Sequence, residues 1–203
     1  MFRGIEAMDA AAKAGAAAIK MQTYTAGTMT LDMAEGEFFL SDPTSLWKGR
    51  SMHELYASAA TPWEWHRPIM ERAAEHGILA FSSPFDESAV DFLEELEVPA
   101  YKIASFECVD IPLLRRVAAT GKPLIISTGA ASLAEIAEAV ETVRSVGRED
   151  LILLQCTSTY PASPENSHLR TIPHMRELFY CEVGLSDHTH GIGAALASVA
   201  MGA

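Results

Sequence analysis

The sequence predicts an α/β fold, a TIM-type (β/α)8 barrel that is incomplete, because six strands can be counted where eight are expected. Short apolar runs alternate with amphipathic helical segments, which is the pattern of a parallel sheet. Polar residues end several of these runs, as expected for a barrel whose chemistry collects at the carboxyl ends of its strands. Neither GxGxxG nor GxxxxGKS/T, the phosphate loops typical of open doubly wound sheets, occurs in the 203 residues. We therefore interpret residues 1–203 as a single partial barrel domain.

The first part of the chain predicts two strands. Residues 2–15 predict a helix, and residues 17–24 predict the strand that follows it. The next predicted strand covers residues 78–85. Asp86 is expected to cap the helix over residues 86–96, because an N-cap carboxylate accepts hydrogen bonds from the first turn.

Four more strands are predicted, at residues 100–106, 123–129 and 151–158 and in a run ending at 183–187. A last helix is predicted over residues 191–203. Asp110 and Pro112 predict the start of a helix after the first of these strands. Ser132 and Glu135 form a capping box for a helix over residues 134–147.

A long insertion at about residues 25–61 interrupts the alternation, where an ordinary βα loop has about 2–6 residues. Thr61, followed by Pro62, is expected to cap the helix that resumes the pattern. The apolar side chains of this stretch predict an ordered segment that forms a lid or part of a subunit contact: Phe38, Phe39, Leu40, Leu46, Trp47, Leu55, Tyr56, Trp63 and Trp65.

The composition excludes two classes of partner. A net charge of −12 argues against nucleic acid, whose phosphates require a basic protein face. No apolar run approaches the length of about 18 residues that spans a membrane, and the N-terminus lacks the pattern of a signal peptide. We expect a cytoplasmic protein without membrane contact. Its three cysteines, Cys108, Cys156 and Cys181, are expected to be buried free thiols.

Two lysines lie inside predicted strands. Lys20 occurs in AIKMQ and Lys102 in AYKIAS. A buried ammonium without a partner is costly, so each lysine must reach solvent or pair with an anion, and for either lysine alone an acidic side chain is sufficient. Together with hydroxyls at Ser105, Ser127, Ser158 and Ser186, the pair favours a site for the phosphate or carboxylate of a small metabolite.

Three further residues have two interpretations each. His188, after Asp187 at a strand end, could bind a divalent metal, although a lone histidine is more often structural. Glu107 could act as an acid, a base or an acceptor for a substrate hydroxyl, or it could cap the helix that begins near Pro112. Tyr160 precedes a proline in a predicted rigid turn, and its phenol could bind a ligand.

Eight stretches, in this order, resemble the sialic acid synthase family: IKMQTYT, LWKGRSMHELY, TPWEWH, FSSPFD, VPAYKIASFE, GKPLIISTG, LLQCTSTYPASPE and GLSDHTHGIG. The resemblance runs through nearly the whole chain, and TYT, LWxG and TPWEWH are most similar to the pseudaminic acid synthase branch. It implies a TIM-barrel transferase that condenses phosphoenolpyruvate with a 2,4-diacetamido-2,4,6-trideoxyhexose. The implied products are phosphate and a nine-carbon nonulosonic acid such as pseudaminic acid.

The same resemblance implies the site. The phosphoenolpyruvate-binding residues of the family match Lys20, Ser83, Lys102, Ser105, Ser127 and Ser186, with Gln22 and Tyr160 nearby. Lys20, Lys102 and Glu107 are the expected catalytic residues, and Ser158 and Asp187 complete the expected substrate-binding set. A divalent metal, Mn²⁺ or Mg²⁺, is expected at His188, with a second histidine ligand outside this chain.

Two alternatives remain open. One is an N-acetylneuraminate or legionaminic acid synthase, and the other is a non-catalytic, anion-binding fragment of such a synthase. Members of the family have a first strand, an eighth strand and usually an antifreeze-like domain that this sequence does not match, and they commonly form homodimers. An incomplete barrel would expose two sheet edges, so we expect poor stability unless another segment or chain covers them.

Overall fold

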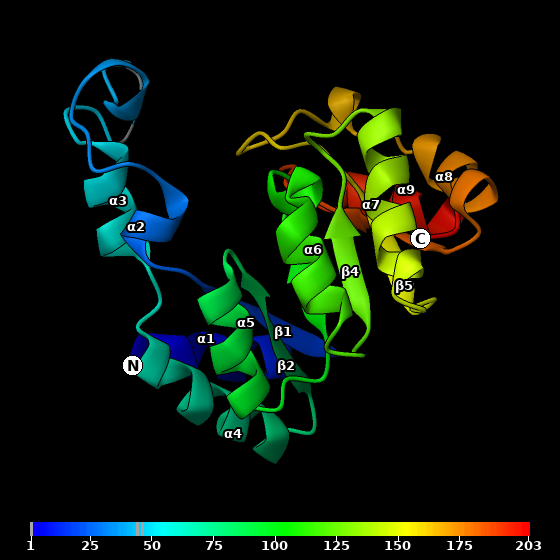
Figure 1. The fold of residues 1–203 in the computed structure, drawn as a ribbon, viewed down its shortest axis with the longest axis horizontal. Coiled ribbons are helices and arrows are strands. Elements are labelled where there is room, and N and C mark those ends of the chain that lie inside the picture. The colour runs from blue at the N-terminus through cyan, green and yellow to red at the C-terminus, as the bar shows by residue number, and fades with distance from the viewer. Residues whose placement is uncertain (1, 44, 46) are drawn as a thin grey trace. The chain divides into compact units, whose positions relative to one another are not determined.

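The structure is a computed structural model that describes residues 2–43, 45 and 47–203. Leu46, predicted as an apolar residue of the insertion, lies outside the described residues. The chain divides into two compact units, residues 1–98 and residues 99–203. Both units consist of parallel strands that alternate with helices, as the sequence predicts (Figure 1).

The first unit contains two parallel strands, and its regular elements are α1 (Phe2–Lys13), β1 (Ala18–Thr23), α4 (His66–Glu75), β2 (Leu79–Pro84) and α5 (Glu87–Glu95). Met21 of β1 and Ala80 of β2 pack against Met8 of α1 and Ile69 of α4, so one face of the strand pair is covered by helices. The predicted cap of α5 is confirmed, because an Asp86 carboxylate oxygen accepts a hydrogen bond from the Ala89 amide at 2.7 Å.

The insertion is ordered over its described residues, and it contains α2 (Ala26–Met29), η1 (Gly36–Phe38) and α3 (Met52–Ala59), followed by η2 (Trp63–Trp65). Tyr56 of α3 packs edge-on against Tyr24 at the end of β1, with ring centroids 6.0 Å apart. Trp63 donates its indole N–H to the Tyr24 carbonyl at 3.3 Å. The prediction that Thr61 caps the next helix is wrong, because the 3-10 turn η2 intervenes and α4 begins only at His66.

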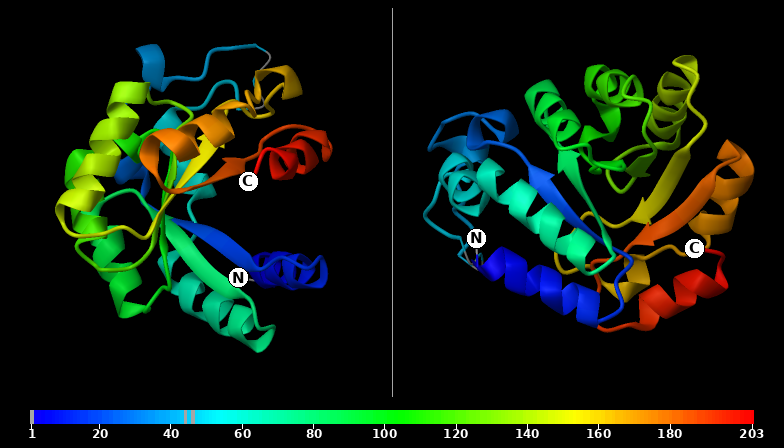
Figure 2. Two further views of the ribbon diagram at one scale, coloured as in Figure 1. Left: turned by 90° about the vertical axis from the view of Figure 1, so that its right-hand side faces the viewer. Right: turned by 90° about the horizontal axis from the view of Figure 1, so that it is seen from below.

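The second unit contains a four-stranded parallel sheet in chain order (Figure 2). Its elements are β3 (Tyr101–Ile103), η3 (Glu107–Val109), α6 (Ile111–Ala118), β4 (Leu124–Ser127), α7 (Leu133–Ser145), β5 (Leu151–Cys156), η4 (Pro164–Asn166), α8 (Thr171–Phe179), β6 (Glu182–Ser186) and α9 (Gly193–Ala200).

Side-chain caps begin two helices of this sheet as predicted. Asp110 accepts the Leu113 amide at 3.0 Å and starts α6, and Ser132 forms a capping box with Glu135 at the start of α7. The alternative in which Glu107 caps α6 is wrong, because the cap is Asp110 and Glu107 lies in η3.

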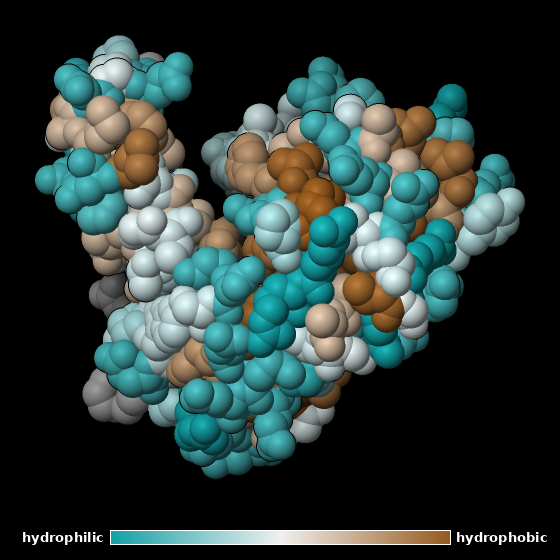
Figure 3. Space-filling model, viewed as in Figure 1, coloured by the Kyte–Doolittle hydropathy of each residue, from teal (hydrophilic) through white to brown (hydrophobic). Residues whose placement is uncertain are grey.

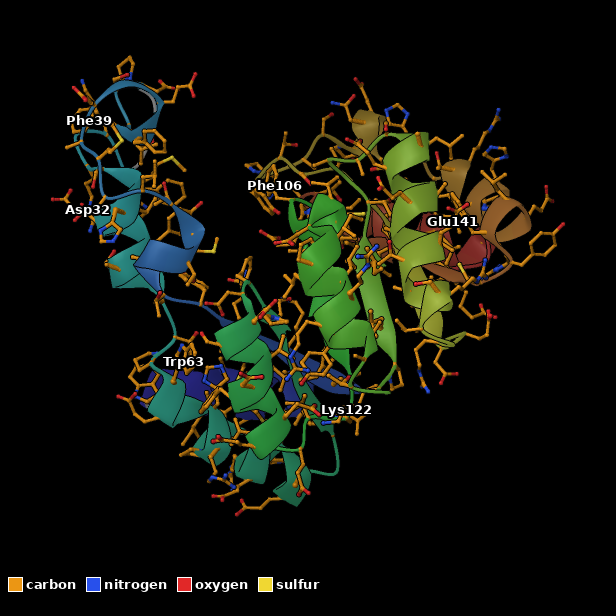
Figure 4. All side chains as sticks on the ribbon, in the orientation of Figure 1. Asp32, Phe39, Trp63, Phe106, Lys122 and Glu141 are labelled. Atoms are coloured by element: carbon orange, nitrogen blue, oxygen red, sulfur yellow. The ribbon has the colours of Figure 1, made fainter. Side chains whose placement is uncertain are left out.

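The outer surfaces of these helices are mainly polar. In Figure 3, hydrophilic residues cover much of the face that α6 and α7 present to the viewer, with hydrophobic residues scattered among them. Glu141 of α7 is exposed on this face (Figure 4). Over the described part of the chain, no helix combines the length and apolar character needed to cross a membrane.

Candidate active site

Strand register assigns several predicted site residues to one face of the second unit's sheet. Lys102 of β3 is in register with Ile125 of β4, and Ser127 lies two residues beyond Ile125. Ser127 is in register with Leu154 of β5, and Cys156, two residues further on, is in register with Ser186 of β6. Since side chains alternate between the faces of a sheet, these four share a face: Lys102, Ser127, Cys156 and Ser186.

Lys102 is buried, with 7% of its surface exposed, and it is held at its tip. Its ammonium donates to Ser127 Oγ at 2.5 Å and to the Ile103 carbonyl at 3.0 Å. These two acceptors fix the position of the ammonium at the strand ends. A buried, oriented ammonium of this kind is suited to an anionic ligand, because charge-assisted hydrogen bonds to an anion are among the strongest that a protein makes.

Ser105 and Gly129 form the next part of the site. Ser105 Oγ accepts a hydrogen bond from the Gly129 amide at 3.2 Å and donates its own hydrogen to Cys156 Sγ at 3.5 Å. Gly129 permits a close approach, since a Cβ there would lie 2.8 Å from the Cys156 carbonyl oxygen and 2.6 Å from Ser158 Oγ. The strand ends of β3, β4 and β5 therefore converge at this point.

Glu107 is half-buried beside this cluster, and its Oε2 lacks a hydrogen-bond partner among the described residues. Burial raises the pKa of the Glu107 carboxyl above its ordinary value, and nearby Asp110 raises it further, while the charge of Lys102 opposes them. A carboxyl with a raised pKa retains its proton to higher pH than an ordinary glutamate does, which is the direction that favours a proton donor.

His188 is held by the segment that follows β5. Its Nδ1 lies 3.1 Å from the Thr157 carbonyl oxygen, which can only accept, so Nδ1 carries the hydrogen. The His188 carbonyl accepts the Ala162 amide at 2.9 Å, and the Tyr160 ring packs on the imidazole with centroids 4.4 Å apart. The Tyr160–Pro161 peptide is cis within this turn. This arrangement leaves Nε2 of His188 as the ring nitrogen with an available lone pair.

The donor chemistry of His188 fits a divalent metal, since metal-bound histidines usually donate their other ring N–H to a carbonyl or carboxylate. Within the described ranges, however, no group of three or more His, Cys, Asp or Glu side chains could hold an ion. Neighbouring Asp187 is exposed and accepts the Thr189 amide at 2.9 Å, which assigns its carboxylate to the local turn. At this site, His188 is the imidazole of the described residues whose contacts orient it for a metal.

The first unit carries the other predicted residues, Lys20, Gln22 and Ser83. Gln22 of β1 is in register with Ser83 of β2, so these two share a face, and Lys20 lies on that face as well. Lys20 and Gln22 are exposed and border a hollow of about 330 Å³. Partial desolvation lowers the pKa of the Lys20 ammonium. Ser83, in contrast, is buried.

A model of the NeuB family matches residues 7–203, which is far more than half of the sequence. The chain belongs to the NeuB family.

Relatives of this NeuB-family chain include the pseudaminic acid synthase of Campylobacter jejuni subsp. jejuni serotype O:2, which is 45% identical over 98% of the chain. The N,N'-diacetyllegionaminic acid synthase of the same organism is 33% identical over 97% of the chain. The chain spans 57% and 59% of the lengths of these two relatives.

A solved relative supports the fold class. The crystal structure of the N-acetylneuraminic acid synthetase of Leptospira borgpetersenii serovar Hardjo-bovis, in complex with citrate, matches with a TM-score of 0.87 and 31% identity. The match covers 98% of this chain and 64% of that one. The prediction of an α/β fold of the barrel type is thereby confirmed.

Two features of the NeuB-family chain escaped the sequence interpretation. Cys156 is a buried free thiol, as predicted, but it contacts three of the predicted site residues. His66, in the first unit, is fully buried and lies with Nε2 2.7 Å from Thr23 Oγ1, which in turn lies 2.7 Å from Ser82 Oγ. No motif in the sequence marks either contact, because both depend on how the strands pair and the helices pack.

The other two cysteines behave differently from each other. Cys108 is buried, and burial raises the pKa of its thiol to about 11. Cys181, at the start of the β6 region, is only half-buried, so the prediction of a buried thiol is wrong there. It lies directly before Glu182, the first residue of β6, and not inside the strand.

Proposed function

We propose that this chain forms the core of a nonulosonic acid synthase of the pseudaminic branch. The enzyme would condense phosphoenolpyruvate with the aldehyde of a 2,4-diacetamido-2,4,6-trideoxyhexose. The observation that carries the proposal is the buried Lys102 ammonium, fixed by Ser127 at the strand ends, in a chain 45% identical to a pseudaminic acid synthase. The Lys102 ammonium is a local positive charge in a protein whose net charge is −12.

In the proposed reaction, C3 of phosphoenolpyruvate attacks the aldehyde carbon, and the aldehyde oxygen takes up a proton. Water then adds at C2 and loses a proton, and the resulting tetrahedral carbon expels inorganic phosphate by C–O cleavage. One C–C bond and one C–O bond to the water oxygen form, and one C–O bond to phosphate breaks. The C2 hydroxyl then loses its proton, and the product is a nine-carbon 2-keto acid. No electron donor or acceptor is required.

Lys102, Ser127 and Ser105 would bind the anionic groups of phosphoenolpyruvate and of the tetrahedral intermediate. Donors that are oriented before the substrate arrives stabilise developing charge without reorganisation. Ser158 and Ser186, at the ends of β5 and β6, would add hydroxyl donors to the same set. Lys20, Gln22 and Ser83 are proposed as substrate-binding residues by their match to the family.

Glu107 would supply the proton that the aldehyde oxygen takes up. Its raised pKa is the property that such a donor needs, because a carboxylic acid with an ordinary pKa is almost fully ionised near pH 7. Tyr160, exposed beside His188, would contact the sugar.

A divalent metal, Mn²⁺ or Mg²⁺, would be held by His188 together with ligands from outside this chain. When bound it would supply Lewis-acid polarisation of the aldehyde. His188 itself presents Nε2, and its orientation is set by the Thr157 carbonyl.

The test begins with calorimetric titration of phosphoenolpyruvate into the chain and into Lys102→Met. Loss of a charge-assisted contact should weaken binding by about tenfold or more. The control is Lys122→Met, which removes a lysine of the same unit that precedes β4 and lies over the Tyr101 ring (Figure 4). Equal affinity in wild type and Lys102→Met, or no binding at all, would contradict the proposal.

The sugar is identified by the mass of the product. The chain is incubated with phosphoenolpyruvate, Mn²⁺ and either the diacetamido sugar or N-acetylmannosamine. A nine-carbon acid from the first sugar alone supports the pseudaminic or legionaminic branches, and product stereochemistry separates those two. A product from N-acetylmannosamine favours a neuraminate synthase, and binding without product favours an anion-binding fragment.

A further inference from the structure

We propose that the thiol of Cys156 is a positioning residue, which holds Ser105, Ser158 and His188 in the arrangement that receives the anionic substrate. The inference rests on the proposed function in its choice of ligand. It assigns to Cys156 a role that its sequence context, an apolar strand end, does not indicate.

Cys156 Sγ lies at the centre of three polar contacts. It is 3.5 Å from Ser105 Oγ on the β3 side, 3.8 Å from Ser158 Oγ and 3.9 Å from His188 Nδ1 after β6. The three partners come from three different strand ends. Ser105 is 51 residues from Cys156 in sequence and His188 is 32 residues from it, whereas Ser158 is two residues away. Only 6% of the Cys156 surface is exposed.

The donors of two of the three contacts can be assigned. Ser105 donates to Sγ, and its Oγ accepts the Gly129 amide. His188 Nδ1–H donates mainly to the Thr157 carbonyl, with Sγ as a more distant second acceptor. In the third contact either the Cys156 thiol or the Ser158 hydroxyl can donate. A neutral thiol, which is one weak donor and a weak acceptor, satisfies all of these contacts.

Sulfur suits this position because of its size. A thiol reaches further from its Cα than a hydroxyl and accepts hydrogen bonds at longer distances. Serine at position 156 would keep a donor and an acceptor but would lie farther from its three partners. Alanine would remove both functions and leave the Ser105 hydroxyl free to rotate. We therefore expect the three partners to be held best by cysteine at position 156, less well by serine and least well by alanine.

The first measurement needs no ligand. Hydrogen exchange of the Gly129 amide is followed by NMR in wild type, Cys156→Ser and Cys156→Ala, because this amide donates to the Ser105 hydroxyl that Cys156 holds. We expect faster exchange by about fivefold or more in Cys156→Ala and a smaller effect in Cys156→Ser. The control is Cys181→Ala, which removes a thiol just before the amino end of β6, whereas His188 follows the carboxyl end. This variant should leave the exchange rate of the Gly129 amide unchanged.

The second measurement is the affinity for phosphoenolpyruvate by calorimetry, alongside the midpoint of thermal unfolding. We expect affinity to fall about three- to tenfold in Cys156→Ala, with partial recovery in Cys156→Ser, as for loss of one orienting hydrogen bond. If Cys156 only fills space, Cys156→Ser should bind phosphoenolpyruvate no more tightly than Cys156→Ala does. Any loss of affinity should then be proportional to the loss of thermal stability. That result would overturn the inference.

The two measurements separate the inference from the proposed function. Absence of phosphoenolpyruvate binding in the wild-type chain would refute the proposed function, while Gly129 exchange would still decide the role of Cys156. Unchanged Gly129 exchange in both Cys156 variants overturns the inference even if the chain binds phosphoenolpyruvate. If Cys156→Ala does not fold, the comparison of wild type with Cys156→Ser decides it.

Discussion

Glu107 shows how a single carboxyl links stability and function. Its Oε2 is buried without a hydrogen-bond partner in the described part of the chain, and burial is the largest cause of its raised pKa. Ionising such a group in the folded state costs more than ionising it in the unfolded chain. Once it is ionised, a buried carboxyl of this kind therefore lowers the unfolding free energy of the chain.

Glu107→Gln should make the second unit less sensitive to rising pH. Because the folded pKa lies above the ordinary value of 4.5, the wild-type carboxyl contributes its full stability below pH 4.5, and this contribution is lost as pH rises through the folded pKa. Urea denaturation at pH 4.5 and pH 7.5 should show Glu107→Gln gaining stability relative to wild type at the higher pH. Glu141→Gln, an exposed substitution on α7, is the control. If the stability of Glu107→Gln relative to wild type is the same at both pH values, Glu107 is not a buried carboxyl that retains its proton.

The segment between β5 and α8 is the element on which the His188 side of the site depends. It is fastened at two points, since Thr157 Oγ1 donates to the Asn166 carbonyl at 2.7 Å and Gln155 Nε2 donates to the Ser167 carbonyl at 3.3 Å. The same segment supplies the Thr157 carbonyl that receives His188 Nδ1–H. A loop anchored by side chains in this way positions a neighbouring residue more precisely than loop backbone alone.

Thr157→Val should loosen this segment while preserving side-chain shape. Loss of the hydrogen bond to the Asn166 carbonyl should cost about 1 kcal/mol of unfolding free energy. The amide of Ala162, which donates to the His188 carbonyl, should exchange faster in the variant. Thr159→Val changes an exposed threonine of the same segment and should affect neither quantity. Equal exchange of the Ala162 amide in wild type and Thr157→Val would refute the anchoring role.

Across the whole molecule, periodicity and capping residues predicted the elements because these depend on local sequence. The strand containing Lys102 and the capping box of Ser132 were both correctly predicted in this way. Residues 61–66 were mispredicted, because a proline after threonine suits both a helix start and the 3-10 turn that forms. The contacts of Cys156 and His66 could not be predicted, since strand pairing and helix packing bring together residues that are far apart in sequence.

The two units offer a direct test of their independence. All three tryptophans, Trp47, Trp63 and Trp65, belong to residues 1–98, so tryptophan fluorescence reports on the first unit, while circular dichroism reports on the helices of both. His66, in the first unit, is fully buried, and burial lowers the pKa of its imidazole below 6.5. As pH falls through 6.5 the unfolded chain takes up this proton before the folded unit does, so stability falls until the folded pKa is reached.

The fluorescence midpoint in urea should therefore decrease between pH 7.5 and pH 5.5, and His66→Gln should reduce that decrease. Gln cannot take up the proton, so the pH dependence is diagnostic even where the substitution lowers stability at both pH values. His174→Gln, an exposed change on α8 in the second unit, is the control. An equal decrease in wild type and His66→Gln would show that other groups govern the acid response. A single circular dichroism transition that coincides with the fluorescence transition at both pH values would show that the two units unfold as one, whereas a second circular dichroism transition that does not move with pH would show that they unfold separately.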